Sequence, residues 1–145
     1  MVFGGTFARA RRGRGASGEG LYRTRSGKPA LHDAFCPHLG AHLGHEGRVI
    51  GETIRCPFHG WQFNAEDGKC SSIPYCDEIP ERARIRTWHV DEKNGEVYVW
   101  FHPENTGPQW ALPDLPELGD PNWTSPRYTE HLVLSCAGRY SCGAK

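Results

Sequence analysis

The sequence lacks any run of apolar residues approaching the roughly 18 that a transmembrane helix needs. It also lacks an excess of charge of either sign, because 17 basic residues balance 17 acidic ones. Composition therefore gives no support for a nucleic-acid partner or for an anionic membrane surface. An apolar signal segment is missing ahead of the six cysteines as well, which disfavours a secreted disulfide scaffold.

Two short motifs contain cysteine and histidine close together. The first reads CPHLGAH at residues 36–42, and the second reads CPFHGW at residues 56–61. Each motif offers one thiol and one imidazole a residue or two apart, a spacing that lets a tight loop point both side chains at one metal centre. Together the two loops would supply four ligands: Cys36, His38, Cys56 and His59.

The order Cys-x-His followed by Cys-x-x-His fits a [2Fe–2S] cluster of the Rieske kind, in which two histidines replace two cysteines on one iron. We assign Cys36 and Cys56 to one iron, and His38 and His59 to the other. A structural zinc site is the alternative, because Cys2His2 is also a common zinc-binding set. Zinc sites usually pair Cys with Cys and His with His, whereas both motifs here are mixed, which favours the iron–sulfur interpretation.

The residues around the motifs carry a family resemblance. Residues 21–110 resemble the Rieske domain of aromatic-ring and steroid Rieske oxygenases. A closer resemblance, to the cholesterol 7-desaturase family, rests on the two motifs together with GRV at 47–49, EDGKC at 66–70 and IPY at 73–75. Rieske proteins of the cytochrome bc type carry an extra cysteine in each loop, where this chain has Ala41 and Phe58. The oxygenase or ferredoxin branch is therefore favoured.

This resemblance implies an all-β fold, a Rieske-type antiparallel β sandwich or small barrel whose cluster-binding subdomain consists of two hairpin loops. Residues 1–20, rich in Arg and Gly, predict a disordered or irregular lead-in. Residues 21–110 would form the Rieske domain. Residues 111–145 would form a proline-rich connector and the truncated start of a catalytic domain, with YTEHLVL at 128–134 as its first strand.

The resemblance also implies electron transfer within a sterol-acting non-haem iron oxygenase of the cholesterol 7-desaturase type. Such an oxidoreductase takes electrons from a reductase or ferredoxin, ultimately from NAD(P)H, and passes them to a mononuclear Fe(II) that activates O2. That iron needs two histidines and a carboxylate, and no helix bearing them is recognisable, so we expect this chain alone not to convert a sterol. Full-length members form homotrimers, and membrane anchoring in animal members implies a cytoplasmic-face location.

Two other functions stay open at this point. A stand-alone Rieske ferredoxin would shuttle electrons and needs little more than one domain, although it requires neither the proline connector nor the stretch at 128–134. A Cys2His2 zinc module would have a structural role and would contain zinc without sulfide. His42 and His45 are interpreted as polar residues of the first ligand loop, because the glycines around them disfavour a helix. The other histidines outside the ligand set are isolated and carry no signal: His32, His89, His102 and His131.

Turn residues predict how the strands pair. Residues 21–24 and 30–34 would pair across Gly27, and residues 48–50 and 53–56 across Gly51. Residues 85–90 and 97–101 would form a third hairpin across Asn94-Gly95, which is a strong hairpin signal. Alternation along this third hairpin places Trp100 on the face opposite the core, and the predicted core face holds Trp88, Val90, Val97, Val99 and Phe101.

Overall fold

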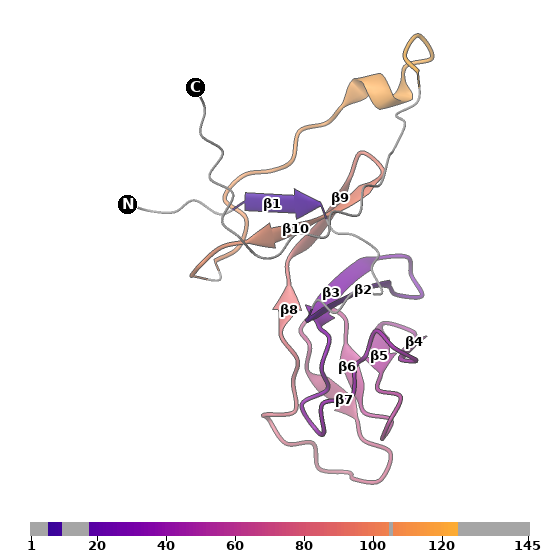
Figure 1. Cartoon of the computed structure of the whole chain (residues 1–145), viewed down its shortest axis with the longest axis vertical. Helices are drawn as coiled ribbons and strands as arrows, with labels where there is room; N and C mark the ends of the chain where they lie inside the picture. The colour runs from indigo at the N-terminus through magenta and orange to yellow at the C-terminus, as the bar shows by residue number, and fades with distance from the viewer. Residues whose placement is uncertain (1–5, 10–17, 105, 125–145) are drawn as a thin grey trace, which may run out of the picture. The chain divides into compact units, whose positions relative to one another are not determined.

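The computed structural model describes residues 6–9, 18–104 and 106–124, and most of the regular secondary structure in these ranges is β-strand (Figure 1). Ten strands and one short 3-10 helix occur there, whereas no α-helix does. All strands pair antiparallel, in three sheets. The expected all-β, antiparallel fold class is confirmed. No helix in these ranges combines the length and the hydropathy needed to cross a membrane.

Two compact units make up the chain, residues 1–114 and residues 115–145. All ten strands belong to the first unit. In the second unit, the described residues 115–124 contain the 3-10 helix η1 (Pro116–Gly119). The predicted strand at 128–134 lies outside the described residues, as do Cys136 and Cys142.

A four-stranded sheet lies next to the two ligand motifs. Its strands are β4 (Arg48–Ile50), β5 (Thr53–Arg55), β6 (Gln62–Asn64) and β7 (Cys70–Ser72), in the order β4-β5-β6-β7 (Figure 1). The hairpin predicted across Gly51 is present, with Val49 opposite Ile54. The second ligand motif therefore connects β5 to β6, so both of its ends are fixed by strand pairing.

A second sheet has the order β2-β3-β8, with β2 (Glu19–Arg23), β3 (Pro29–Asp33) and β8 (Thr87–Trp88). The predicted hairpin across Gly27 joins β2 to β3. His32 on β3 is only 1% exposed. Its Nε2 donates to the carbonyl of Ala65 at 3.0 Å, and its Nδ1 accepts from the Tyr22 hydroxyl at 3.3 Å. Both ring nitrogens are thus satisfied in the neutral form, which makes His32 a core residue.

The third sheet has the order β1-β10-β9, with β1 (Thr6–Arg9), β9 (Val90–Lys93) and β10 (Glu96–Phe101). The turn between β9 and β10 has positive φ at Asn94 (56°) and Gly95 (77°), as the Asn-Gly signal predicts. Strand β1 lies within residues 1–20, where the sequence predicts an irregular lead-in. It forms because the free edge of β10 offers unpaired backbone groups to a strand distant in sequence.

Trp100 corrects an expectation. Alternation placed Phe101 in the core and Trp100 on the opposite face, yet Trp100 is 3% exposed and Phe101 is 47% exposed. The chain after β10 returns over Trp100, whose Nε1 donates to the carbonyl of Thr106 at 2.8 Å. Trp110 meets the same indole edge-on, with 5.9 Å between centroids. Burial here depends on a returning segment, which alternation within a hairpin cannot reveal.

The main hydrophobic core includes the two candidate cysteine ligands. Phe63 on β6 is completely enclosed in it. Because the cysteines are core residues, each ligand loop starts from a buried and well-supported position. The members of this core are Cys36, Leu43, Ile54, Cys56, Phe63, Cys70, Ile73, Ala83 and Ile85.

Candidate metal centre

The first ligand loop is a tight turn that closes on Cys36. The Cys36 N–H donates to the carbonyl of Ala41 at 2.9 Å, and the Gly40 N–H donates to the carbonyl of Cys36 at 2.8 Å. Gly40 has a φ of 73°, a left-handed conformation that glycine adopts at little cost. Within the turn His38 is half-buried, whereas Leu39 is 64% exposed.

The second ligand loop repeats this turn. The Cys56 N–H donates to the carbonyl of Trp61 at 2.8 Å, and the Gly60 N–H donates to the carbonyl of Cys56 at 3.2 Å. Gly60 is again left-handed, with a φ of 77°. His59 is half-buried, and the exposed neighbour is now Phe58, at 64%. The same backbone frame thus carries the histidine one position later than in the first loop.

The two thiols lie close together below the loops. Burial raises the pKa of the Cys36 thiol to about 11, although the N–H of His38 donates to the sulfur and favours the thiolate. A hydrogen bond with the Cys56 thiol raises the pKa of Cys36 as well. A metal bound by these sulfurs would supply the positive charge that displaces the protons.

The two imidazoles meet edge to face. The ring centroids of His38 and His59 are 4.6 Å apart, with an angle of 69° between the planes. The Nδ1 atom of His38 is buried and has no hydrogen-bond partner. A buried ring nitrogen without a partner costs free energy, and a coordinated metal is one group that would satisfy it.

This donor set fits a Rieske-type [2Fe–2S] cluster. Such a cluster takes two thiolates on one iron and two imidazoles on the other, and the structure pairs thiol with thiol and imidazole with imidazole. A single tetrahedral zinc ion would require all four donors to converge on one point.

An aromatic neighbourhood surrounds the imidazoles, and inspection of the motifs did not predict its contacts. The Trp61 indole stacks on the His38 ring, with 4.7 Å between centroids. Its Nε1 donates to the Tyr75 hydroxyl at 2.7 Å. The only signals in the sequence are the tryptophan that follows Gly60 and the family-like IPY at 73–75, and neither reveals a contact between them.

The remaining histidines and cysteines near the loops have other roles. His42 Nδ1 accepts a hydrogen bond from the Gly44 N–H at 3.1 Å, so in the neutral ring Nε2 carries the proton and has no lone pair for a metal. This agrees with its interpretation as a polar loop residue. Cys70 and Cys76 are free thiols, the first buried and the second exposed.

Comparison with known proteins decides the family. The Rieske [2Fe-2S] domain family matches residues 10–89, more than half of the chain and a range that includes both ligand loops. The chain belongs to this family. Membership implies a [2Fe–2S] cluster, and it confirms the Rieske fold that the family resemblance implies.

The relatives of this Rieske chain are oxygenases. Over 113 residues it is 48% identical to the cholesterol 7-desaturase nvd of Xenopus laevis, a match that covers 78% of this chain and 25% of the relative. Over 106 residues it is 43% identical to the probable 3-ketosteroid-9-alpha-monooxygenase, oxygenase component, of Rhodococcus rhodochrous, covering 72% of this chain and 26% of that protein. The chain therefore spans about a quarter of the length of the curated relatives it matches.

Solved structures agree with this relationship. The crystal structure of apo dicamba monooxygenase superposes with a TM-score of 0.60 at 30% sequence identity, covering 70% of this chain and 31% of that chain. A further structure of dicamba monooxygenase contains non-heme iron and dicamba. The predicted resemblance to Rieske oxygenases is thus confirmed for the Rieske region.

Proposed function

We propose that this chain is the electron-transfer domain of a sterol-acting non-haem iron oxygenase of the cholesterol 7-desaturase type. Cys36 and Cys56 would hold one iron of the [2Fe–2S] cluster, and His38 and His59 the other. The observation that carries the proposal is the pairing of two half-buried imidazoles, 4.6 Å apart, beside two buried thiols. The orphaned Nδ1 of His38 supports its role as a ligand.

When bound, a Rieske cluster takes up and releases single electrons, at a higher potential than an all-cysteine cluster because neutral imidazoles replace two anionic thiolates. The protein holds the ligands on two rigid turns that begin in the core. Buried thiols keep water from the sulfur side, whereas the half-buried rings of His38 and His59 can come close to a redox partner. Leu39 and Phe58 provide exposed apolar surface beside these rings.

The partners of the whole protein follow from its relatives and belong to the same proposal. A reductase or ferredoxin would donate electrons that originate from NAD(P)H. A mononuclear Fe(II) site in the complete oxygenase would receive them and activate O2. The names of the relatives, cholesterol 7-desaturase and 3-ketosteroid-9-alpha-monooxygenase, indicate a steroid nucleus as the substrate class.

Reconstitution tests this proposal. The full 145-residue chain is loaded with iron and sulfide and mixed anaerobically with NADPH and a ferredoxin reductase–ferredoxin pair, and the visible spectrum is followed. We expect the cluster to be reduced, and we expect cholesterol added with O2 to stay unconverted by this chain alone. Failure of both the protein partner and dithionite to reduce the loaded chain would contradict an electron-transfer role.

A further inference from the structure

The indole of Trp61 lies parallel to the imidazole of His38. The ring centroids are 4.7 Å apart and the planes differ by 7°. His59 has a different neighbour, the ring of Phe58, which is tilted by 38° and belongs to a side chain that is 64% exposed. The two candidate ligand rings are therefore supported unequally, with His38 resting on the larger and better-covered aromatic surface.

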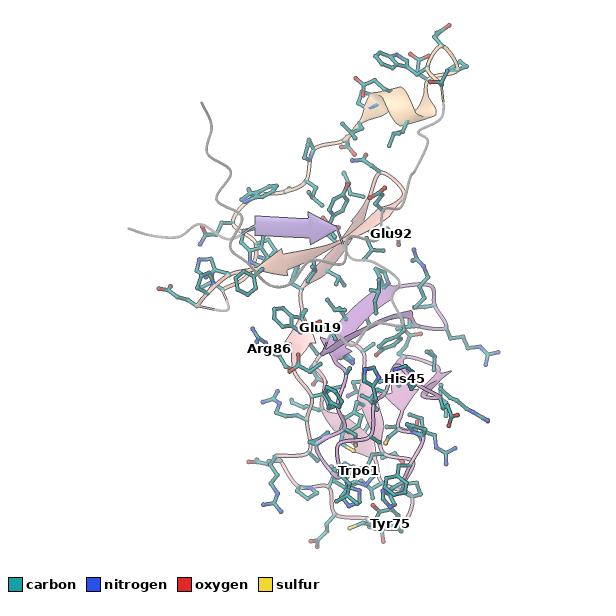
Figure 2. All side chains as sticks on the ribbon, in the orientation of Figure 1. Glu19, His45, Trp61, Tyr75, Arg86 and Glu92 are labelled. Carbon is teal, nitrogen blue, oxygen red and sulfur yellow. The ribbon has the colours of Figure 1, made fainter. Side chains whose placement is uncertain are left out.

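Trp61 is itself held from two sides. Its indole packs against the hydrophobic core, and its Nε1 donates to the Tyr75 hydroxyl at 2.7 Å; Figure 2 shows the two side chains close together. Tyr75 belongs to the short turn at residues 73–76, which its own backbone hydrogen bond closes. From the same turn Pro74 reaches the second ligand loop, where a Cβ atom on Gly60 would lie 2.9 Å from its Cγ. The turn thus restrains Trp61 in two ways. Tyr75 hydrogen-bonds to its indole, and Pro74 packs against Gly60, the residue before it.

We propose that Trp61 and Tyr75 are positioning residues that fix the plane of the His38 imidazole, so that its Nδ1 stays aimed at the cluster. This inference rests on the proposed function, because it requires His38 to be a ligand. Rotation of a histidine ring about χ2 is only weakly restricted by its own bonds. A flat indole against the ring removes that freedom before the cluster binds, so less conformational entropy is lost on binding.

The hydrogen bond to Tyr75 fixes the orientation of the indole that supports the His38 ring. An indole that only packed against the core could still rotate in its own plane or slide across the imidazole. A hydrogen bond from its Nε1 to the Tyr75 hydroxyl fixes the indole at a second point, apart from its attachment to the backbone. Groups that orient a ligand ring in this way tune the metal that it binds. Tyr75 is 61% exposed, so it contributes to this role from the surface of the protein.

Two substitutions separate the stack from its tether. Trp61→Leu removes the stacked ring, and Tyr75→Phe removes only the acceptor for the indole N–H. The full chain is reconstituted with iron and sulfide and then reduced. Pulsed EPR measures the nitrogen hyperfine couplings of the two histidines. A separate experiment measures the rate at which the cluster is released to a chelator. We expect Tyr75→Phe to change one set of histidine couplings and to speed release about fivefold, the effect of losing one ordinary hydrogen bond. Trp61→Leu should change both measurements further.

Rescue and control variants make the result specific. Trp61→Phe keeps an aromatic face against His38 and should restore most of the couplings that Trp61→Leu changes. Trp88→Phe removes an equivalent indole bond, from Trp88 Nε1 to Asp33 Oδ1 at 2.9 Å, and should leave couplings and release rate unchanged because it lies outside the ligand loops.

The outcomes also separate this inference from the proposed function. Wild-type couplings and release rates in both Tyr75→Phe and Trp61→Leu would overturn the positioning role while leaving the cluster assignment intact. If Trp61→Leu does not fold, the exposed position of Tyr75 lets Tyr75→Phe decide alone. A wild-type chain that binds no cluster would overturn the proposed function and this inference with it.

Discussion

The two ligand loops share one backbone turn but differ in what supports them. Each begins with a buried cysteine, each closes with a left-handed glycine, and the hydrogen bonds that close them are equivalent. A Cβ atom on Gly40 would meet nothing within 4 Å, whereas one on Gly60 would meet Pro74 and Arg55. The turn of the first loop is therefore open at its glycine, whereas the turn of the second loop is covered there by its neighbours.

The comparison teaches that the turn and the ligand position are separate features. The first loop places histidine two residues after cysteine, and the second places it three residues after. In each loop, the position that holds histidine in the other loop holds an apolar residue instead. This residue is Leu39 in the first loop and Phe58 in the second, and each is 64% exposed. Equivalent turns thus present their imidazoles from different positions, which lets the rings of His38 and His59 meet edge to face.

The largest effect is expected from exchanging the two positions in the first loop. The double substitution His38→Leu with Leu39→His keeps the composition and the turn but moves the imidazole to an exposed position. We expect the cluster to be lost, as measured by iron and sulfide content after reconstitution. Leu39→Ala is the matched control and should retain the cluster. Full cluster content in the exchanged variant would show that the loop does not fix the ligand position.

A smaller effect is expected from alanine at the two loop glycines. Gly40→Ala should cost about 1–2 kcal/mol of unfolding free energy, because a Cβ atom is disfavoured at positive φ. Gly60→Ala should cost about 1–3 kcal/mol more, because Pro74 and Arg55 must also move. Urea unfolding of the two variants measures the difference. Equal losses would mean that the covering of the second loop does not restrain it.

The smallest effect is expected on the pH dependence of stability and comes from His32, a core residue that is not a candidate ligand. Burial lowers the pKa of His32, so its folded-state value lies below the unfolded value of about 6.5. The unfolded chain then binds the extra proton first, and stability is lost as pH falls below about 6.5, by at most about 1.4 kcal/mol per pH unit for this group. His32→Gln should remove that part of the pH dependence in urea unfolding. An unchanged pH slope in this variant would contradict the assignment of His32 as a buried neutral residue.

Features fixed by local chemistry could be predicted from the sequence. The hairpins across Gly27, Gly51 and Asn94-Gly95 follow from turn residues whose preferences act within a few positions. The candidate ligand set followed from spacing within two loops for the same reason. The structure brings the two candidate cysteines together and the two candidate histidines together, the same pairs that the order of the motifs assigns to the two irons.

Features that depend on contacts outside the predicted hairpins could not be predicted. Burial of Trp100 requires the segment around Thr106 to return over it. Strand β1 requires a partner edge on β10, about ninety residues later in the chain. The bond from Trp61 to Tyr75 joins a ligand loop to a separate turn. The partner of β1 is distant in the sequence, and the segments that reach Trp100 and Trp61 are irregular, so neither periodicity nor turn propensity predicts these contacts.

The most direct test of the central claim is the metal and sulfide content of the wild-type chain, combined with the EPR spectrum of its reduced form. Cys36, His38, Cys56 and His59 are predicted to bind two irons and two acid-labile sulfides per chain, as one Rieske cluster requires. Reduction should give the EPR signal of a histidine-ligated [2Fe–2S] centre. Stoichiometric zinc with no sulfide would contradict the assignment and would favour a structural Cys2His2 site.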